Sequence, residues 1–141
     1  MEIQGGEIRK AIELFFFAYR DFTGEADAIL AKYGFGRAHH RAIYFIGRRP
    51  GIAVHQLLTI LKITKQSINR VIRDLLKTKM IKQLKDDTDT RKKRLFLDKD
   101  GKIFFDTVYK KQKRRIFNAL KSSEPESVIK FKEVLKKIIN G

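Results

Sequence analysis

Residues 55–97 place a short apolar helix, a tight connection, a second, amphipathic helix and a charged hairpin in direct succession. The second helix, expected from Thr64 to about Lys79, separates its residue types onto two faces. The apolar face carries Ile68, Val71, Ile72, Leu75 and Leu76, and the polar face carries Lys65, Gln66, Ser67, Asn69, Arg70 and Arg73. This order of elements predicts a winged helix-turn-helix, in which the polar face of the second helix stays open to a partner.

The composition narrows the kind of partner. The chain of 141 residues is long enough for one folded unit with a sizeable core and too short for two ordinary ones. Its formal net charge of +16 demands a polyanionic partner or heavy counterion screening, and nucleic acid is the first candidate. The chain has no cysteine, which excludes disulfides, cysteine-ligated zinc and thiol-based redox sensing.

The excess positive charge is concentrated in the middle of the chain. Residues 1–34 carry 4 basic and 6 acidic side chains, residues 35–100 carry 17 and 6, and residues 101–141 carry 11 and 4. The basic excess therefore peaks where the helix-turn-helix is expected, which favours a binding surface. The alternative is a lysine-rich proteome that raises the charge of its proteins in general.

Several classes of protein are disfavoured by what the sequence lacks. No apolar run approaches the roughly 18 to 20 residues that span a bilayer, and the N-terminus has no basic start of a secretion signal, so we expect a cytoplasmic protein without a membrane partner. There is no glycine-rich phosphate loop, no nucleophile paired with a base and no carboxylate pair on one predicted face. We therefore expect neither an enzyme nor a cofactor.

The N-terminal part of the chain predicts helices with apolar stripes. Apolar residues recur at three- and four-residue steps from about residue 6 to 33, and a shorter helix follows over 37–47. The first helix includes Phe15, Phe16 and Phe17 in succession, which puts apolar groups on more than one side. A partner subunit is expected to cover them, because one small monomer would leave them exposed.

Two further helices are predicted after the hairpin. Asp98 is placed to cap a helix that runs to about Lys121. Ser123 and Glu126 have the spacing of a capping box for a last, amphipathic helix, with Pro125 in its first turn.

Local chemistry positions the polar helix and the hairpin. The Thr64 hydroxyl can cap the helix, while Ile63 and Ile68 have the spacing of a hydrophobic staple. Past Lys79 the pattern changes from helical to extended, and residues 85–93 are too charged to be buried. We therefore expect them to project into solvent as a wing.

Three sequence signals together resemble the MarR family of bacterial transcriptional regulators, over essentially the whole chain. They are Pro50-Gly51-Ile52 leading into Leu57-Leu58, the block Ile63-Thr64-Lys65-Gln66-Ser67 followed by Arg70-Val71 and Leu75, and the segment Asp89-Thr90-Arg91-Lys92-Lys93-Arg94. The last segment fits the Asp-x-Arg wing pattern of that family and is the sharpest of the three. His55 departs from the family, because relatives usually place Ser or Thr there to cap the first helix of the motif.

The resemblance implies a mainly α-helical protein with a small β-hairpin wing. Residues 1–141 would form a single domain, with a winged-helix DNA-binding lobe at about 37–97 and a helical dimerisation lobe at about 1–34 and 99–141. In the implied homodimer, two recognition helices enter successive major grooves of a near-palindromic operator. Members commonly repress transcription and often release DNA on binding a small aromatic anion.

The residues expected to contact DNA lie on the polar helix and on the wing. Arg pairs with guanine, Asn or Gln with adenine, and hydroxyls with base edges or phosphates, while a wing-tip Arg suits a narrow minor groove. The expected set is Thr64, Lys65, Gln66, Ser67, Asn69, Arg70 and Arg73 on the helix, and Arg91, Lys92 and Lys93 on the wing. The family pattern further implies that Asp89 and Arg94 form an ion pair that supports the wing. A solvated helix face and an exposed turn are the alternatives.

A second candidate site is a cluster of His39, His40, Arg41 and Tyr44. These side chains could together hold a small aromatic or anionic effector such as an aromatic carboxylate, contact phosphates, or pack at a dimer seam. Metal binding by His39, His40 and His55 is not expected, because adjacent histidines point different ways on a helix.

Three functions remain open from the sequence. The leading one is a homodimeric, sequence-specific transcriptional regulator that binds double-stranded DNA and acts as a repressor or as a dual regulator. The others are an architectural, nucleoid-type protein that coats DNA through its charge, and an RNA-binding winged helix.

Overall fold

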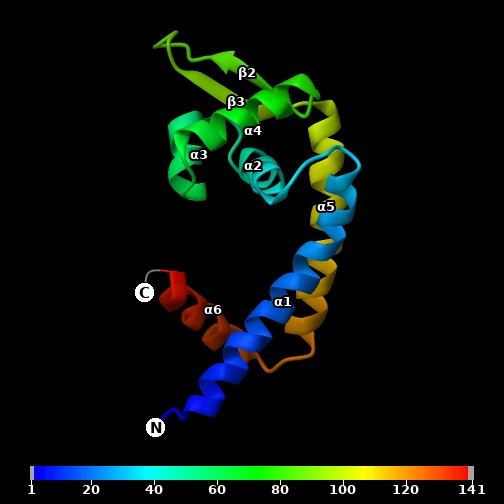
Figure 1. Cartoon of the computed structure of the whole chain (residues 1–141), viewed down its shortest axis with the longest axis vertical. Helices are drawn as coiled ribbons and strands as arrows, with labels where there is room; N and C mark the ends of the chain where they lie inside the picture. The colour runs from blue at the N-terminus through cyan, green and yellow to red at the C-terminus, as the bar shows by residue number, and fades with distance from the viewer. Residues whose placement is uncertain (1, 140–141) are drawn as a thin grey trace. The chain divides into compact units, whose positions relative to one another are not determined.

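The computed structural model describes residues 2–139, and it confirms a mainly helical fold with a small sheet (Figure 1). In chain order, the elements are α1 Gly5–Ala31, α2 Arg37–Arg48, β1 Ile52–Ala53, α3 Val54–Leu61, α4 Lys65–Lys77, β2 Ile81–Lys85, β3 Lys93–Leu97, α5 Lys99–Lys121 and α6 Pro125–Ile139. The predicted helices all occur. The dimerisation lobe expected from the sequence includes residues 1, 140 and 141, and these three residues lie outside the part of the chain that the structure describes.

The chain forms two compact units, residues 1–108 and residues 109–141, whose boundary falls within α5. The first unit holds the helix-turn-helix and the sheet. The second unit holds the later part of α5 and all of α6, and α6 buries none of its described residues.

The sheet contains a strand that the sequence pattern did not predict. Its antiparallel order is β1-β3-β2, with Ile52 of β1 opposite Leu95 and Ile81 of β2 opposite Leu97. β1 has two residues, which is too short to show an alternating pattern. Because β3 is central, its Leu95 is fully buried.

The core of the first unit is built from nearly every element. Its fully buried large side chains come from α1, α2, α3, α4, the turn before β2, and strands β2 and β3: Leu30, Ile43, Ile46, Leu57, Ile68, Leu75, Met80, Ile81 and Leu95. Gly34 ends the turn after α1 with a φ of 72°, a conformation that glycine adopts without strain. The apolar residues predicted for one face of α4 belong to this core or pack against it.

The helix-turn-helix is produced by a sharp turn between α3 and α4. Lys62 ends α3 in the left-handed conformation, with a φ of 52°. Two residues later, the Thr64 hydroxyl accepts a hydrogen bond of 3.0 Å from the Ser67 amide, which confirms Thr64 as the N-cap of α4. Ile63 packs against the core that contains Ile68, as a hydrophobic staple requires.

Two expected helix caps differ in the structure. The capping box of Ser123 and Glu126 is wrong, because the Ser123 hydroxyl donates to the Ala119 carbonyl at the end of α5. Glu124 precedes α6 instead, and its carbonyl accepts the first helical bond, from the Val128 amide. Asp98 lies where expected, since its carbonyl accepts from the Lys102 amide and its carboxylate from the Lys99 amide.

The start of α3 does not need a serine or threonine at position 55. The helix begins at Val54, so His55 lies inside its first turn. The Gln56 side-chain oxygen accepts a 2.9 Å hydrogen bond from the Ala53 amide and fastens the entry of the chain into the helix.

Candidate nucleic-acid interface

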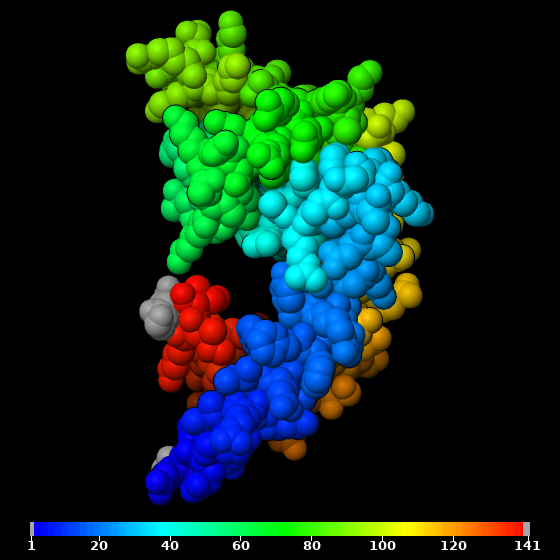
Figure 2. All heavy atoms as spheres, in the orientation of Figure 1, coloured from blue at the N-terminus to red at the C-terminus, as the bar shows by residue number. Residues whose placement is uncertain are grey.

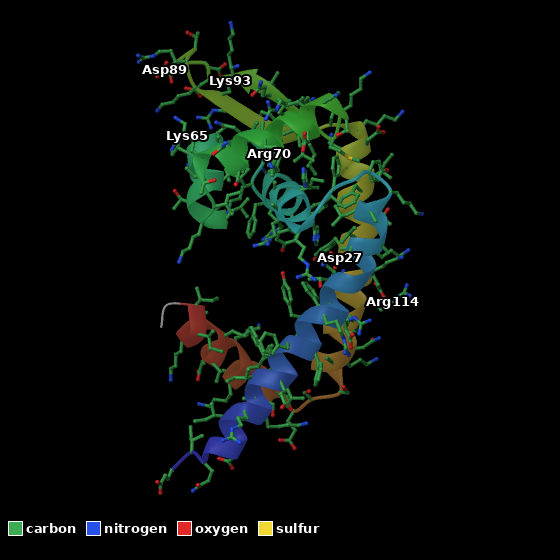
Figure 3. All side chains as sticks on the ribbon, viewed as in Figure 1. Asp27, Lys65, Arg70, Asp89, Lys93 and Arg114 are labelled. Carbon is green, nitrogen blue, oxygen red and sulfur yellow. The ribbon has the colours of Figure 1, made fainter. Side chains whose placement is uncertain are left out.

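The polar face of α4 is open to solvent. Lys65, Gln66, Ser67, Asn69, Arg70 and Arg73 are all exposed, whereas Ile68, Val71, Ile72 and Leu75 are buried. In Figure 3, Lys65 lies near the start of α4 and Arg70 farther along it. The division into two faces predicted from the sequence is thus present, and it presents donors and acceptors of the kind that major-groove edges pair with.

The hairpin extends beyond the helices and has a hydrogen-bonded tip. The space-filling view shows α3, α4 and the β2–β3 hairpin as one continuous surface (Figure 2), and Asp89 and Lys93 lie toward the hairpin's end (Figure 3). One Asp89 oxygen accepts from the Arg91 amide at 3.1 Å and from its Nε at 3.2 Å. The Arg91 side chain is 90% exposed. The wing tip therefore presents the Arg91 guanidinium to solvent, while Asp89 holds the Arg91 backbone in place.

The wing is supported by a different ion pair from the one expected. Arg94 pairs with Asp86, with 2.5 Å between Nε and the carboxylate, while Asp89 pairs with Arg91. The strand register explains this: Lys85 lies opposite Lys93, and the Asp86 amide donates to the Lys92 carbonyl, so Asp86 opposes Lys92 and lies diagonally across from Arg94 on the same face. The Arg94 Nη1 also donates to the Gly51 carbonyl at 3.1 Å. Arg94 therefore ties the base of the wing to the turn before β1.

Asp86 organises the turn at the wing base. Its second oxygen accepts from the Thr88 hydroxyl at 2.8 Å and from the Asp89 amide at 3.2 Å. The hydrogen bond from Arg94, followed by that from Thr88, lowers the pKa of the Asp86 carboxyl from 3.8 to about 2. The carboxylate is thus ionised at neutral pH and holds the Arg94 guanidinium.

Asp86→Asn is expected to lower stability at pH 7, because Arg94 loses its carboxylate partner. A folded-state pKa below the unfolded one contributes stability that is complete above about pH 4 and is lost as the pH falls toward 2. The difference in the free energy of unfolding between wild type and Asp86→Asn should therefore shrink as the pH falls from about 4 toward 2. Urea unfolding midpoints at a series of pH values measure it. The exposed neighbour Asp87, changed to Asn, is the control, and an equal effect of both variants would contradict the assignment.

His39, His40 and Tyr44, three of the four residues of the second candidate site, make separate contacts. His39 bridges two segments: its Nδ1 accepts from the Gly36 amide at 3.1 Å, and its Nε2 lies 2.9 Å from an Asp74 oxygen on α4. Because Nδ1 accepts, Nε2 carries the hydrogen and donates to Asp74. Sequence reasoning missed this link between α2 and α4, since 35 residues separate the two side chains.

Two of the other three residues, His40 and Tyr44, pack against aromatic rings of α5. Burial lowers the pKa of His40, so its ring is neutral at pH 7 and brings no charge to an anion. The ring packs edge-on against Phe104, and Tyr44 stacks on Phe105. Arg41 is exposed. Within residues 2–139, no three His, Asp or Glu side chains are grouped to hold a metal ion.

Comparison with known proteins shows which family the chain belongs to. The MarR family model matches residues 33–92, which include α2, the helix-turn-helix and most of the wing. The HTH-type transcriptional regulator PetP of Rhodobacter capsulatus is 39% identical over 134 residues, which cover 95% of this chain and 81% of that protein. This chain belongs to the MarR family. It is a DNA-binding transcriptional regulator, a class distinct from enzymes.

Solved structures of MarR-type regulators share the fold. FabT of Streptococcus pneumoniae, in a complex with DNA, matches with a TM-score of 0.76 at 16% identity, over 94% of this chain and 95% of that chain. S. aureus MepR in its DNA-binding conformation matches with a TM-score of 0.73 at 18% identity, over 92% and 96%. Among residues 2–139, no helix has the length and apolar composition needed to cross a membrane.

Proposed function

We propose that this MarR-family chain is a homodimeric repressor that reads a near-palindromic operator. In this proposal α4 of each subunit enters the major groove, and Arg91 reaches the adjacent minor groove. The observation that carries it is the exposed polar face of α4 beside the cationic wing tip. Arg70 and Asn69 supply base-edge contacts, while Lys92 and Lys93 supply contacts to phosphates.

Uncovered apolar surface supports the homodimer. The part of α1 before Phe22 buries no residue, and its stripe of Ile8, Ile12, Phe15 and Phe16 is half-exposed or more. In the second unit, α6 exposes Ile129, Phe131, Val134, Ile138 and Ile139. Apolar surface of this extent is typical of a subunit interface, and a second copy of the chain would offer the same surface in a two-fold arrangement.

Footprinting on genomic fragments with excess competitor DNA tests the proposal. A repressor dimer should protect a segment with two half-sites about one helical turn apart. Uniform coverage would instead support the architectural alternative, which the 10 basic and 3 acidic side chains of residues 109–139 favour. Preference for RNA over duplex DNA would contradict both. Loss of the footprint on adding an aromatic carboxylate would add an effector response to the proposal.

Arg70→Ala and Lys92→Ala should weaken binding in different ways. Loss of a base contact by Arg70 should cost about 1–3 kcal/mol on the operator and relax the preference at one position. Loss of a phosphate contact by Lys92 should weaken binding to operator and random duplex alike and lower the salt dependence by about one counterion. Titrations of both duplexes at several salt concentrations measure the difference, and equal effects from the two variants would refute this division of roles.

A further inference from the structure

A polar hollow lies beside α3, between the turn after α2 and strand β3. Its volume is about 460 Å³, and its walls are the turn after α2, α3 and β3. Arg49, His55, Gln56, Thr59 and Arg94 are the polar residues that line it. A smaller hollow of about 190 Å³ shares three of them and extends the lining to Lys92 of the wing. The two hollows thus run from the α2–β1 turn to the wing base.

The lining is suited to an anion. In the larger hollow, two arginines and a histidine occur without any acidic residue. The smaller hollow includes Asp86, but this carboxylate already pairs with Arg94. Gln56 and Thr59 add neutral polar groups. An oxyanion placed here would therefore meet cationic donors and no unpaired carboxylate from the lining residues.

One wall of the larger hollow is held rigidly. Arg94 is fixed by its bonds to Asp86 and to the Gly51 carbonyl, so its guanidinium does not need to be ordered by a ligand. On another wall, the Arg49 guanidinium lies 5.9 Å from the centre of the Phe45 ring. A site with fixed donors loses less conformational entropy when it binds.

We propose that this hollow receives one phosphate group of the DNA backbone, with Arg49 and His55 as contact residues. A duplex that meets both α4 and the wing carries its backbone past the first helix of the motif, which here is α3. The two hollows are lined by residues of α3 and of the wing base, which are the parts of the motif that this backbone passes. The proposal rests on DNA binding by the family, and it is independent of operator symmetry and of dimerisation.

Arg49→Gln tests the proposal, with Arg48→Gln as the matched control. Arg48 is the exposed neighbour at the end of α2 and does not line the hollow. Loss of one phosphate contact should weaken binding about eightfold at 0.1 M salt, equally for operator and random duplex, and reduce the salt slope by about one. Arg48→Gln should retain the wild-type affinity and slope.

Two results would overturn the proposal. The first is a wild-type salt slope in Arg49→Gln when its thermal unfolding matches wild type. The second is binding of free phosphate in place of DNA. In that case inorganic phosphate, compared with chloride at equal ionic strength, would raise the unfolding temperature of wild type but not of Arg49→Gln, and the two proteins would bind DNA with the same affinity. Loss of DNA binding in wild type itself would instead refute the proposed repressor.

Discussion

Gly101→Ala is expected to remove much of the stability of the winged-helix unit. A Cβ atom at this position would lie 1.9 Å from the Met80 carbonyl oxygen and 2.8 Å from the Met80 carbonyl carbon. That oxygen is held in place, because it accepts a 2.9 Å hydrogen bond from the Asp98 amide. Since backbone cannot rotate aside as a side chain does, α5 has to shift, at a cost of about 3 kcal/mol or more. Urea unfolding measures the loss.

Gly24→Ala is the matched control for this prediction. Gly24 also lies within a helix, and a Cβ atom there would meet nothing within 4 Å. Alanine should stabilise that helix by about 0.5–1 kcal/mol, because glycine loses more backbone entropy on folding. The two substitutions are therefore expected to change the free energy of unfolding in opposite directions. A stable Gly101→Ala variant would show that α5 does not pack directly on the Met80 backbone.

Phe15→Glu is expected to yield monomers, if α1 forms the seam of the proposed dimer. The Phe15 side chain is 53% exposed in the single chain and lies on the apolar stripe of α1. Burying one phenylalanine contributes about 2 kcal/mol, and two-fold symmetry doubles the effect. Removing both side chains should weaken association about a thousandfold, before the cost of burying the new carboxylates. Sedimentation velocity across a range of concentrations measures the dissociation constant.

Lys10→Glu provides the control on the same helix. At 100° per residue, Lys10 lies about 140° around α1 from Phe15, so it introduces a carboxylate away from the stripe. This variant should remain dimeric. An intact dimer in Phe15→Glu would show that Phe15 lies outside the seam, and dissociation of both variants would show that charge on α1, rather than apolar contact, controls association.

The sequence predicted the helices, the hairpin and the two faces of α4, because all three follow from local patterns. The helical period separates Ile68 and Leu75 from Arg70 and Arg73, and the Thr64 cap is recognisable from its residue type and place. The wing was predictable as a charged hairpin for the same reason.

The links between segments could not be read from local patterns. The pairing of Arg94 with Asp86 rather than Asp89 depends on the strand register, which the charged loop does not specify. The contact of His39 with Asp74 and the pairing of β1 with β3 join residues far apart in the chain. Such contacts follow from how the elements pack, so they required the structure.

Sequence-specific binding by a pair of chains is tested most directly by sedimentation of the protein on the footprinted duplex. We predict a complex of two chains per duplex. Its affinity should be at least about a thousandfold higher than that for a scrambled duplex at the same salt concentration, a difference in binding free energy on the order of 4 kcal/mol. One chain per duplex, or equal affinity for the scrambled sequence, would contradict the proposed operator-reading dimer.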